Sequence, residues 1–124
     1  MNIRDTIQIS GASFQSESVC LSLIVDNKLA IMDVVQDLTI KGGGWIITRI
    51  NVPEIHRGKG YGSALLDRFL ELADHFQKTV SLGASSSNPK FTNGKLREWY
   101  KRHGFIREKG APTNSLIRFP KPKP

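Results

Sequence analysis

The spacing of the apolar residues changes at a glycine-rich segment near the middle of the chain. Before it, residues 45–52 alternate between apolar and polar types well enough for a strand. After it, apolar residues recur every three or four positions, and this spacing predicts an amphipathic helix that carries Leu65, Leu66, Phe69, Leu70, Ala73 and Phe76 on one face. The segment between them, Arg57-Gly58-Lys59-Gly60-Tyr61-Gly62, is therefore predicted to be a turn that leads from a strand into a helix.

Shorter patterns on both sides of this unit predict a mixed sheet. Val, Ile and Leu are concentrated in residues 19–25 and 29–36, and the Asp26-Asn27-Lys28 between them predicts an antiparallel hairpin. A second helix is predicted from a cap at Thr92 or Asn93 to Gly104, with Leu96, Trp99, Tyr100 and His103 on one face. Further short strands are predicted near residues 6–10, 79–84, 105–109 and 115–119. This order predicts an α/β or α+β domain with helices against the sheet.

The composition is that of a globular protein. A chain of 124 residues, 39% hydrophobic and 23% charged, suits one domain spanning residues 1–124. It has no apolar run long enough for a membrane helix and no apolar N-terminal segment typical of a signal peptide, so we expect a cytoplasmic protein without a membrane partner. The single Cys20 has no partner for a disulfide and no clustered ligands for zinc, so we expect a small buried side chain and no metal site.

The positive charge is concentrated in the second part of the chain. Residues 87–124 hold ten Lys and Arg against two Glu, or +8, which leaves −1 for the first 86 residues of a chain whose net charge is +7. A basic region of this kind attracts a polyanionic cofactor, an acidic protein or nucleic acid, and charge alone does not choose among them. The Pro- and Lys-rich end, residues 119–124, is expected to fray.

The glycine-rich turn has the features of a phosphate site. Glycines let a phosphate approach the main chain, and the first turn of a helix presents unpaired N–H groups and a positive dipole end. Two common phosphate loops are excluded by spacing. A dinucleotide fingerprint that starts at Gly58 needs Gly in the sixth place, which is Ser63. A P-loop needs Ser or Thr directly after its Gly-Lys pair. The chain has two such pairs, Gly58-Lys59 and Gly94-Lys95, but they are followed by Gly60 and Leu96.

The same segment resembles the acetyl-CoA turn of the GNAT N-acetyltransferases. Arg57, Gly60 and Gly62 meet the family pattern Arg/Gln-x-x-Gly-x-Gly/Ala, and residues 51–66 resemble the family's motif A nearly throughout. Residues 93–105, with Asn93, Tyr100 and Gly104-Phe105, resemble its motif B. The resemblance implies the GNAT fold, a mixed and mostly antiparallel sheet of about six or seven strands with helices against it.

The resemblance also implies a site and a reaction, the transfer of acetyl from acetyl-CoA to a primary amine. The strand that carries Ile50, Asn51 and Val52 would part from its neighbour at a bulge and pair with the pantetheine arm. A backbone N–H near Val52 would polarise the thioester carbonyl. The pyrophosphate would lie on the turn, and the remaining residues implied as cofactor-binding are Arg57, Gly58, Lys59, Gly60, Tyr61, Gly62, Ser63 and Asn93. Tyr100 is the implied general acid that protonates the CoA thiolate.

The sequence departs from the family in two places. The strand before motif A, residues 45–50, carries no carboxylate or imidazole, so the usual general base is absent. Asp33, Glu54, His56 and a water chain remain open as routes for the proton. Only about 18 residues precede the strand at Val19, which leaves no room for the family's N-terminal helix pair. We therefore expect an open acceptor site, suited to a protein or a small amine, which a second copy of the chain could complete.

Two other functions remain open at this stage. A non-catalytic CoA-binding regulatory or interaction module is favoured by the missing carboxylate and opposed by Tyr100. A nucleic-acid-binding protein would use residues 87–124, with Trp99 or Tyr100 stacked on bases. These aromatic residues fit a helix core better and no recognised nucleic-acid motif is present, so a nucleic-acid partner is not expected.

Overall fold

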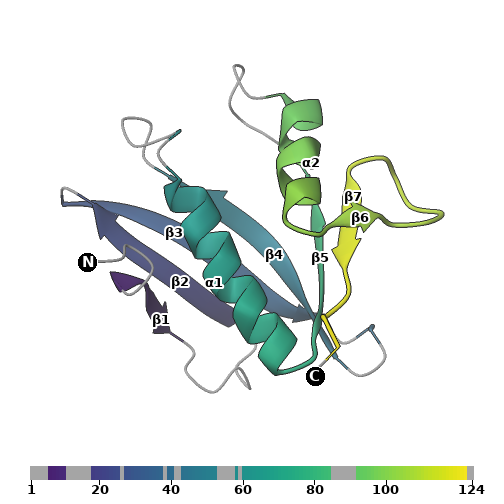
Figure 1. Ribbon diagram of the computed structural model, residues 1–124, viewed down its shortest axis with the longest axis horizontal. Coiled ribbons are helices and arrows are strands. Elements are labelled where there is room, and N and C mark those ends of the chain that lie inside the picture. The colour runs from purple at the N-terminus through teal and green to yellow at the C-terminus, as the bar shows by residue number, and fades with distance from the viewer. Residues whose placement is uncertain are drawn as a thin grey trace.

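The computed structural model describes residues 6–10, 18–25, 27–37, 39–40, 43–52, 58, 60–84 and 92–122. Seven strands and two helices lie in these ranges (Figure 1). In chain order they are β1 (Gln8–Ser10), β2 (Ser18–Val25), β3 (Lys28–Asp37), β4 (Gly44–Asn51), α1 (Tyr61–His75), β5 (Thr79–Gly83), α2 (Asn93–Arg102), β6 (Ile106–Arg107) and β7 (Ser115–Arg118). All the strands and both helices predicted from the sequence are present.

The strands form one sheet in the order β1-β2-β3-β4-β5-β7-β6. Every neighbouring pair is antiparallel except β4 and β5, which run parallel. A parallel pair needs a crossover connection, and α1 supplies it. The predicted mixed, mostly antiparallel sheet is confirmed, and only the seven residues 11–17 separate β1 from β2, fewer than a helix pair requires.

Both helices lie against the same face of the sheet (Figure 1). Alternate residues of β2 and β3 point to this face and are buried, among them Leu21, Leu23, Met32 and Val34. The apolar side of α1 covers them with Leu65, Leu66, Phe69, Leu70 and Ala73. Burial of a side chain such as Phe69 stabilises the fold by about 1.5–3 kcal/mol, so the stripe recognised in the sequence is the main attachment of α1 to the sheet.

The ends of α2 are held by the residues that its sequence pattern indicates. Thr92 is the N-cap, and its hydroxyl oxygen accepts a hydrogen bond of 3.2 Å from the backbone N–H of Lys95. At the other end, Gly104 adopts φ +96°, a left-handed conformation that favours glycine, and its N–H donates to the carbonyl of Lys101. Of the two predicted caps, Thr92 is the one used.

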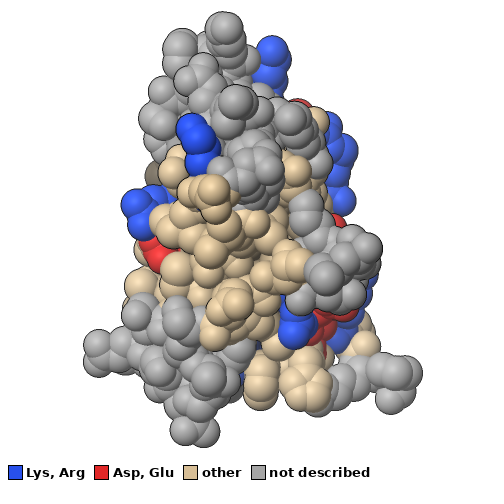
Figure 2. All heavy atoms as spheres, turned by 90° about the vertical axis from the view of Figure 1, so that its left-hand side faces the viewer, with Lys and Arg blue, Asp and Glu red and all other residues tan. Residues whose placement is uncertain are grey.

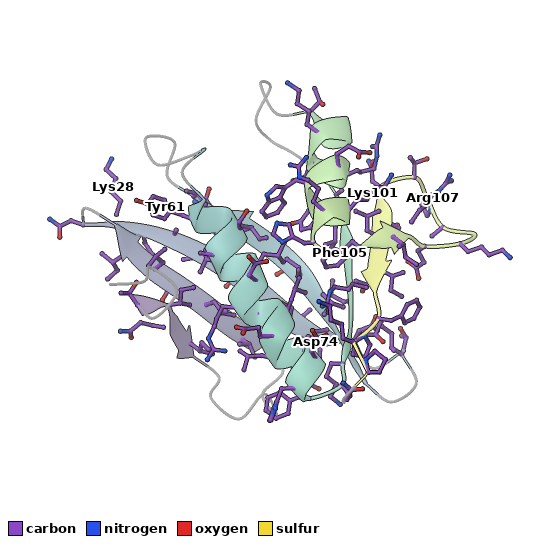
Figure 3. All side chains as sticks on the ribbon, in the orientation of Figure 1. Lys28, Tyr61, Asp74, Lys101, Phe105 and Arg107 are labelled. Atoms are coloured by element: carbon purple, nitrogen blue, oxygen red, sulfur yellow. The ribbon has the colours of Figure 1, made fainter. Side chains whose placement is uncertain are left out.

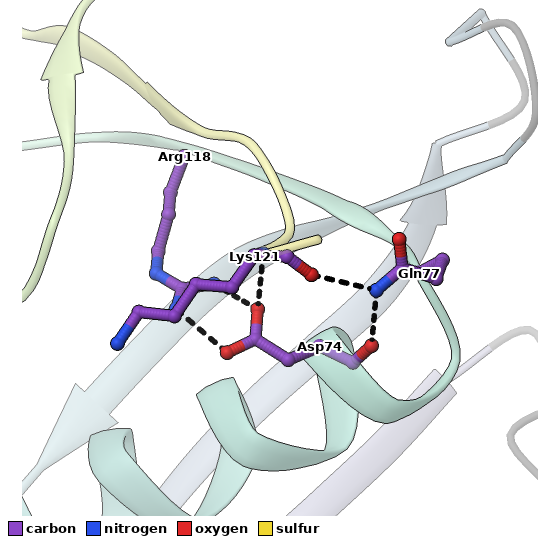
Figure 4. A network of polar contacts seen from close by, with 4 residues as sticks. All are labelled: Asp74, Gln77, Arg118 and Lys121. Atoms are coloured by element: carbon purple, nitrogen blue, oxygen red, sulfur yellow. Dashed lines mark hydrogen bonds and ion pairs between the residues drawn. The ribbon is translucent and has the colours of Figure 1, made fainter. Parts of the chain in front are cut away.

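The C-terminal segment is attached to the end of α1. The carboxylate of Asp74 accepts hydrogen bonds from Arg118 and from the backbone N–H of Lys121, and the Gln77 amide donates 2.8 Å to the Lys121 carbonyl (Figure 4). Residues 119–124 were expected to fray. Within this segment, the backbone of Lys121 is held by these hydrogen bonds to Asp74 and Gln77, which the Pro- and Lys-rich composition does not indicate. Residues 123–124 lie outside the described part of the chain.

Candidate active site

Strand β4 leaves its parallel neighbour halfway along its length. It pairs with β3 as far as Asn51, but with β5 only over Gly44–Ile47, whose partners are Thr79–Leu82. Figure 1 shows β4 and β5 diverging toward the end at which α1 begins. Among the residues that the structure describes, the edge of β4 from Thr48 to Asn51 therefore has no strand partner on the β5 side. Its backbone N–H and C=O groups can hydrogen-bond an extended ligand placed in this opening.

A bulge lies where the two strands part. Asp33 is the partner of Arg49 and Val34 is the partner of Ile47, so Thr48 is an extra residue in β4. A bulge bends its strand and increases the local twist, which explains why β4 turns away from β5 at this point. The bulge implied by the family resemblance is thus present, at Thr48.

The first turn of α1 lies next to this opening. Its N-cap is Gly60, with φ +86° and no side-chain cap, and its first turn carries no acidic residue. The amides of Gly62 and Ser63 precede the first intrahelical hydrogen bond, from Ala64 to Gly60 at 2.9 Å. A Cβ at Gly58 or Gly60 would meet no atom of the described part of the chain within 4 Å, so these residues leave the main chain accessible there. Arg57 and Lys59 lie outside the described residues.

One residue of α2, Trp99, also lies beside the first turn of α1. A Cβ built on Gly62 would lie 3.7 Å from Cζ2 of Trp99 and 3.7 Å from Cγ2 of Val52, so the indole and the end of β4 both flank the first turn of α1. The indole Nε1 of Trp99 donates a hydrogen bond of 3.2 Å to the hydroxyl of Ser63. Asn93, the first residue of α2, is half-buried at its N-terminal end.

Tyr100 is a buried phenol on the same helix. It is 6% exposed, and its ring packs against Phe105 and Trp99 at centroid distances of 5.4 and 4.9 Å. Among the described residues its hydroxyl has no hydrogen-bond partner. Burial raises the pKa of Tyr100 to about 12, because desolvation penalises the phenolate. The side chain therefore holds its proton at neutral pH.

The structure gives no support to Asp33 as a free base. Its Oδ2 accepts a hydrogen bond of 2.9 Å from Nε of Arg49 and forms an ion pair with Nη2 at 2.8 Å, on the sheet face opposite the helices. Cys20, its partner across β2 and β3, is half-buried rather than fully buried because it faces away from α1. Burial, together with the neighbouring Asp33, raises the pKa of the Cys20 thiol. Glu54 and His56 lie outside the described residues.

The described C-terminal part of the chain is rich in basic side chains. Described residues 92–122 contain eight Lys and Arg and two Glu. Lys101 and Arg107 lie on the side of α2 and β6 that is turned away from α1 (Figure 3). Figure 2, viewed from the left-hand side of Figure 1, shows a surface on which most described residues are uncharged. Part of the positive charge of residues 92–122 therefore lies beside α2 and β6, on the side turned away from α1.

Contacts between the two helices were not anticipated from the sequence. Besides the bond between Trp99 and Ser63, Nδ1 of His103 lies 2.8 Å from Oδ1 of Asp67. The available signal was spacing. Ser63 and Asp67 are four residues apart on α1, and Trp99 and His103 are four residues apart on α2, so each helix carries its two residues on one face. Nothing local indicates that these two faces meet.

No three His, Cys, Asp or Glu side chains within the described ranges are grouped so that they could hold a metal ion. Neither α1 nor α2, the helices of the described part, is long and apolar enough to cross a bilayer.

Comparison with known proteins adds to this geometry. Residues 18–107 match the family model of the acetyltransferase (GNAT) domain. No curated protein sequence matches the chain. ElaA of Escherichia coli is similar in structure with a TM-score of 0.61 and 22% identity, over 88% of this chain and 73% of that one.

Two further solved structures share the architecture. Tetrahymena GCN5 gives a TM-score of 0.62 and 12% identity, over 89% of this chain and 72% of that one. KacTA in its complex with DNA gives a TM-score of 0.65 and 14% identity, over 84% of this chain and 69% of that one. At these identities the structural likeness establishes the fold alone, whereas the family model covers both sequence motifs.

Proposed function

Because the chain belongs to the GNAT acetyltransferase family, we propose that it transfers the acetyl group of acetyl-CoA to the nitrogen of a primary amine. The observation that carries this proposal is the parting of β4 from β5 directly beside the uncapped first turn of α1. An extended chain with a diphosphate at one end suits such a site, because it needs a strand edge for its amides and a helix N-terminus for its charge.

The proposed cofactor site uses both features. The pantetheine arm pairs with β4 at Ile50, Asn51 and Val52, and Asn93 at the start of α2 hydrogen-bonds it from the opposite side. The pyrophosphate rests on the backbone from Gly58 to Ser63, where Arg57 and Lys59 add positive charge. This placement rests on the motif positions and on the absence of an obstructing Cβ at Gly58 and Gly60.

The proposed reaction is direct attack in a ternary complex. The amine nitrogen forms a bond to the acetyl carbon, the carbon–sulfur bond breaks, and the nitrogen loses a proton to a base or to water. Tyr100 gives its proton to the leaving thiolate. A phenol of pKa about 12 remains protonated at neutral pH, so it is available as a donor.

The proposed acceptor class is supported by the short connection between β1 and β2. Only residues 11–17 connect β1 to β2, where relatives with a longer connection build part of the acceptor site. An open site accommodates a protein lysine, a protein N-terminus or a small amine, and a dimer partner could complete it. We place the activity in the cytoplasm.

Ligand-induced stabilisation tests the cofactor, since a ligand that binds only the folded state raises its melting temperature. We expect acetyl-CoA to raise it, and NAD or single-stranded DNA at the same concentration to leave it unchanged. Labelled acetyl-CoA and fractionated cell extract, followed by mass spectrometry, would then identify the acetylated acceptor. No thermal shift at millimolar acetyl-CoA would contradict the proposal, and a shift without acetyl transfer would indicate a non-catalytic CoA-binding module.

A further inference from the structure

The two helices are joined by two polar contacts at matching helical spacing. Nε1 of Trp99 donates to Oγ of Ser63 at 3.2 Å, and Nδ1 of His103 lies 2.8 Å from Oδ1 of Asp67. Ser63 and Asp67 are four residues apart on α1, as Trp99 and His103 are on α2. The contacts are therefore successive, one helical turn apart, and only the first lies at the N-terminal turn of α1.

The chemistry of the first contact sets the direction of the Ser63 hydroxyl. An indole N–H can only donate, so Ser63 Oγ must accept. A hydroxyl that accepts one bond still has its own proton to donate. No described contact uses that proton. Within the described ranges this proton has no acceptor, and the hydroxyl lies in the first turn of α1, where anions are favoured.

Packing holds the indole in this position. Its ring lies against the first turn of α1, since Cζ2 would be 3.7 Å from a Cβ on Gly62. On α2 it contacts the Tyr100 ring at 4.9 Å and the His103 ring at 5.1 Å, both edge-to-face. With neighbours on several sides, Trp99 has little freedom to turn its N–H elsewhere.

We propose that Trp99 is a positioning residue for the acyl donor: its indole N–H orients the Ser63 hydroxyl so that the hydroxyl donates to the pyrophosphate of acetyl-CoA. This inference rests on the proposed function. It also identifies the part of the donor that Trp99 serves, namely the phosphate end and not the thioester. Trp99 itself touches neither the reacting carbon nor the leaving sulfur in this assignment.

The test compares two acyl donors in two variants. Trp99→Phe keeps an aromatic ring but removes the N–H, and Ser63→Ala removes the hydroxyl. We expect each to raise the KM for acetyl-CoA about three- to tenfold, the loss of roughly one hydrogen bond, with kcat changed less than twofold. Acetyl-pantetheine lacks the pyrophosphate, so with this donor both variants should match the unmodified protein.

Two further measurements separate orientation from general packing. The double variant should be no worse than either single variant, because both remove the same interaction. Asp67→Ala, which removes only the second contact, is the matched control and should leave the KM for acetyl-CoA unchanged. An equal loss with both donors, an unaltered KM in Trp99→Phe, or additive effects in the double variant would each overturn the proposal.

Failure of the proposed function would look different. If the unmodified protein binds acetyl-CoA without turning it over, the same comparison is made on the Kd from calorimetry, with CoA and pantetheine as ligands. If it binds neither, the proposed function and the role of Trp99 are both wrong. If it binds CoA and the Trp99→Phe Kd is unchanged, only the role of Trp99 is wrong.

Discussion

The guanidinium of Arg118 donates two hydrogen bonds to the carboxylate of Asp74, at 2.8 and 3.0 Å, across a separation of 44 residues. Arg118 is 5% exposed and is the buried charged residue of the described core. The pair connects β7 to the last turn of α1, and Nε of Arg118 would lie 3.2 Å from a Cβ on Gly104. One ion pair therefore joins three segments of the fold.

Loss of Asp74 should be strongly destabilising. Asp74→Ala leaves Arg118 as an unpaired buried charge, which costs about 3–5 kcal/mol of unfolding free energy. Urea denaturation of the two proteins measures this difference in unfolding free energy. The control is Glu71→Gln one turn earlier on α1, where an exposed pair with Arg68 at 3.9 Å predicts a change of about 0.5 kcal/mol or less. An Asp74→Ala loss as small as the control would show that Arg118 finds water or another partner.

Acid should weaken the fold through the same residue. Burial alone would raise the pKa of Asp74, but hydrogen bonds from Arg118 and from the Lys121 N–H, with the charges of both residues, outweigh it and lower the pKa. A lowered pKa contributes stability that is present above the unfolded value, about 3.9, and lost as the pH falls through the folded value. Unfolding free energy measured from pH 6 downward should decline less steeply in Asp74→Asn, and an identical slope would contradict this assignment.

Tyr100→Phe should separate binding from chemistry. We expect the Kd for CoA to stay within about twofold, since the ring and its packing remain, and kcat to fall by about 100-fold or more, since the proton donor is lost. Calorimetry and steady-state kinetics measure the two effects. Unchanged kcat would remove Tyr100 from the mechanism, whereas weaker CoA binding with normal kcat would make it a packing residue.

The same tyrosine should limit stability in alkali. Its folded pKa, about 12, lies above the unfolded value of about 10, so its contribution is fully present below pH 10 and lost as the pH rises through 12. Between pH 10 and pH 12 the unfolding free energy should fall by about 3 kcal/mol on account of Tyr100. Urea titrations above pH 10 should show a shallower decline for Tyr100→Phe. Tyr100 and Tyr61 are the two tyrosines, so absorbance of the tyrosinate can be assigned by subtraction.

Two glycines of the phosphate turn should respond differently to alanine. Gly60→Ala places a Cβ on a residue with φ +86°, which costs about 1–2 kcal/mol although no neighbour is touched. Gly62→Ala adds a methyl group at ordinary contact distance, 3.7 Å, and should be neutral or stabilising by up to about 1 kcal/mol. Thermal and urea unfolding compare the pair directly. Equal effects would mean that the left-handed backbone of Gly60 is not required.

The candidate site was predictable to the extent that it lies in continuous segments. The turn around Gly60 and the cap at Thr92 show themselves in neighbouring residues, because glycine torsions and capping hydroxyls act over a few positions. Asp33 illustrates the limit. As a possible base it could be judged only by what lies beside it, and the register of β3 against β4 places Arg49 there.

By itself, the sequence determined the elements, their order and the family, because periodicity, caps and motifs are local properties of the chain. Tertiary structure alone decided that β4 leaves β5 after Ile47, that Trp99 reaches Ser63, and that Arg118 is neutralised by Asp74. Each of these depends on the register or packing of segments far apart in sequence. Such pairings are selected by how the whole core packs, and no short stretch of residues encodes them.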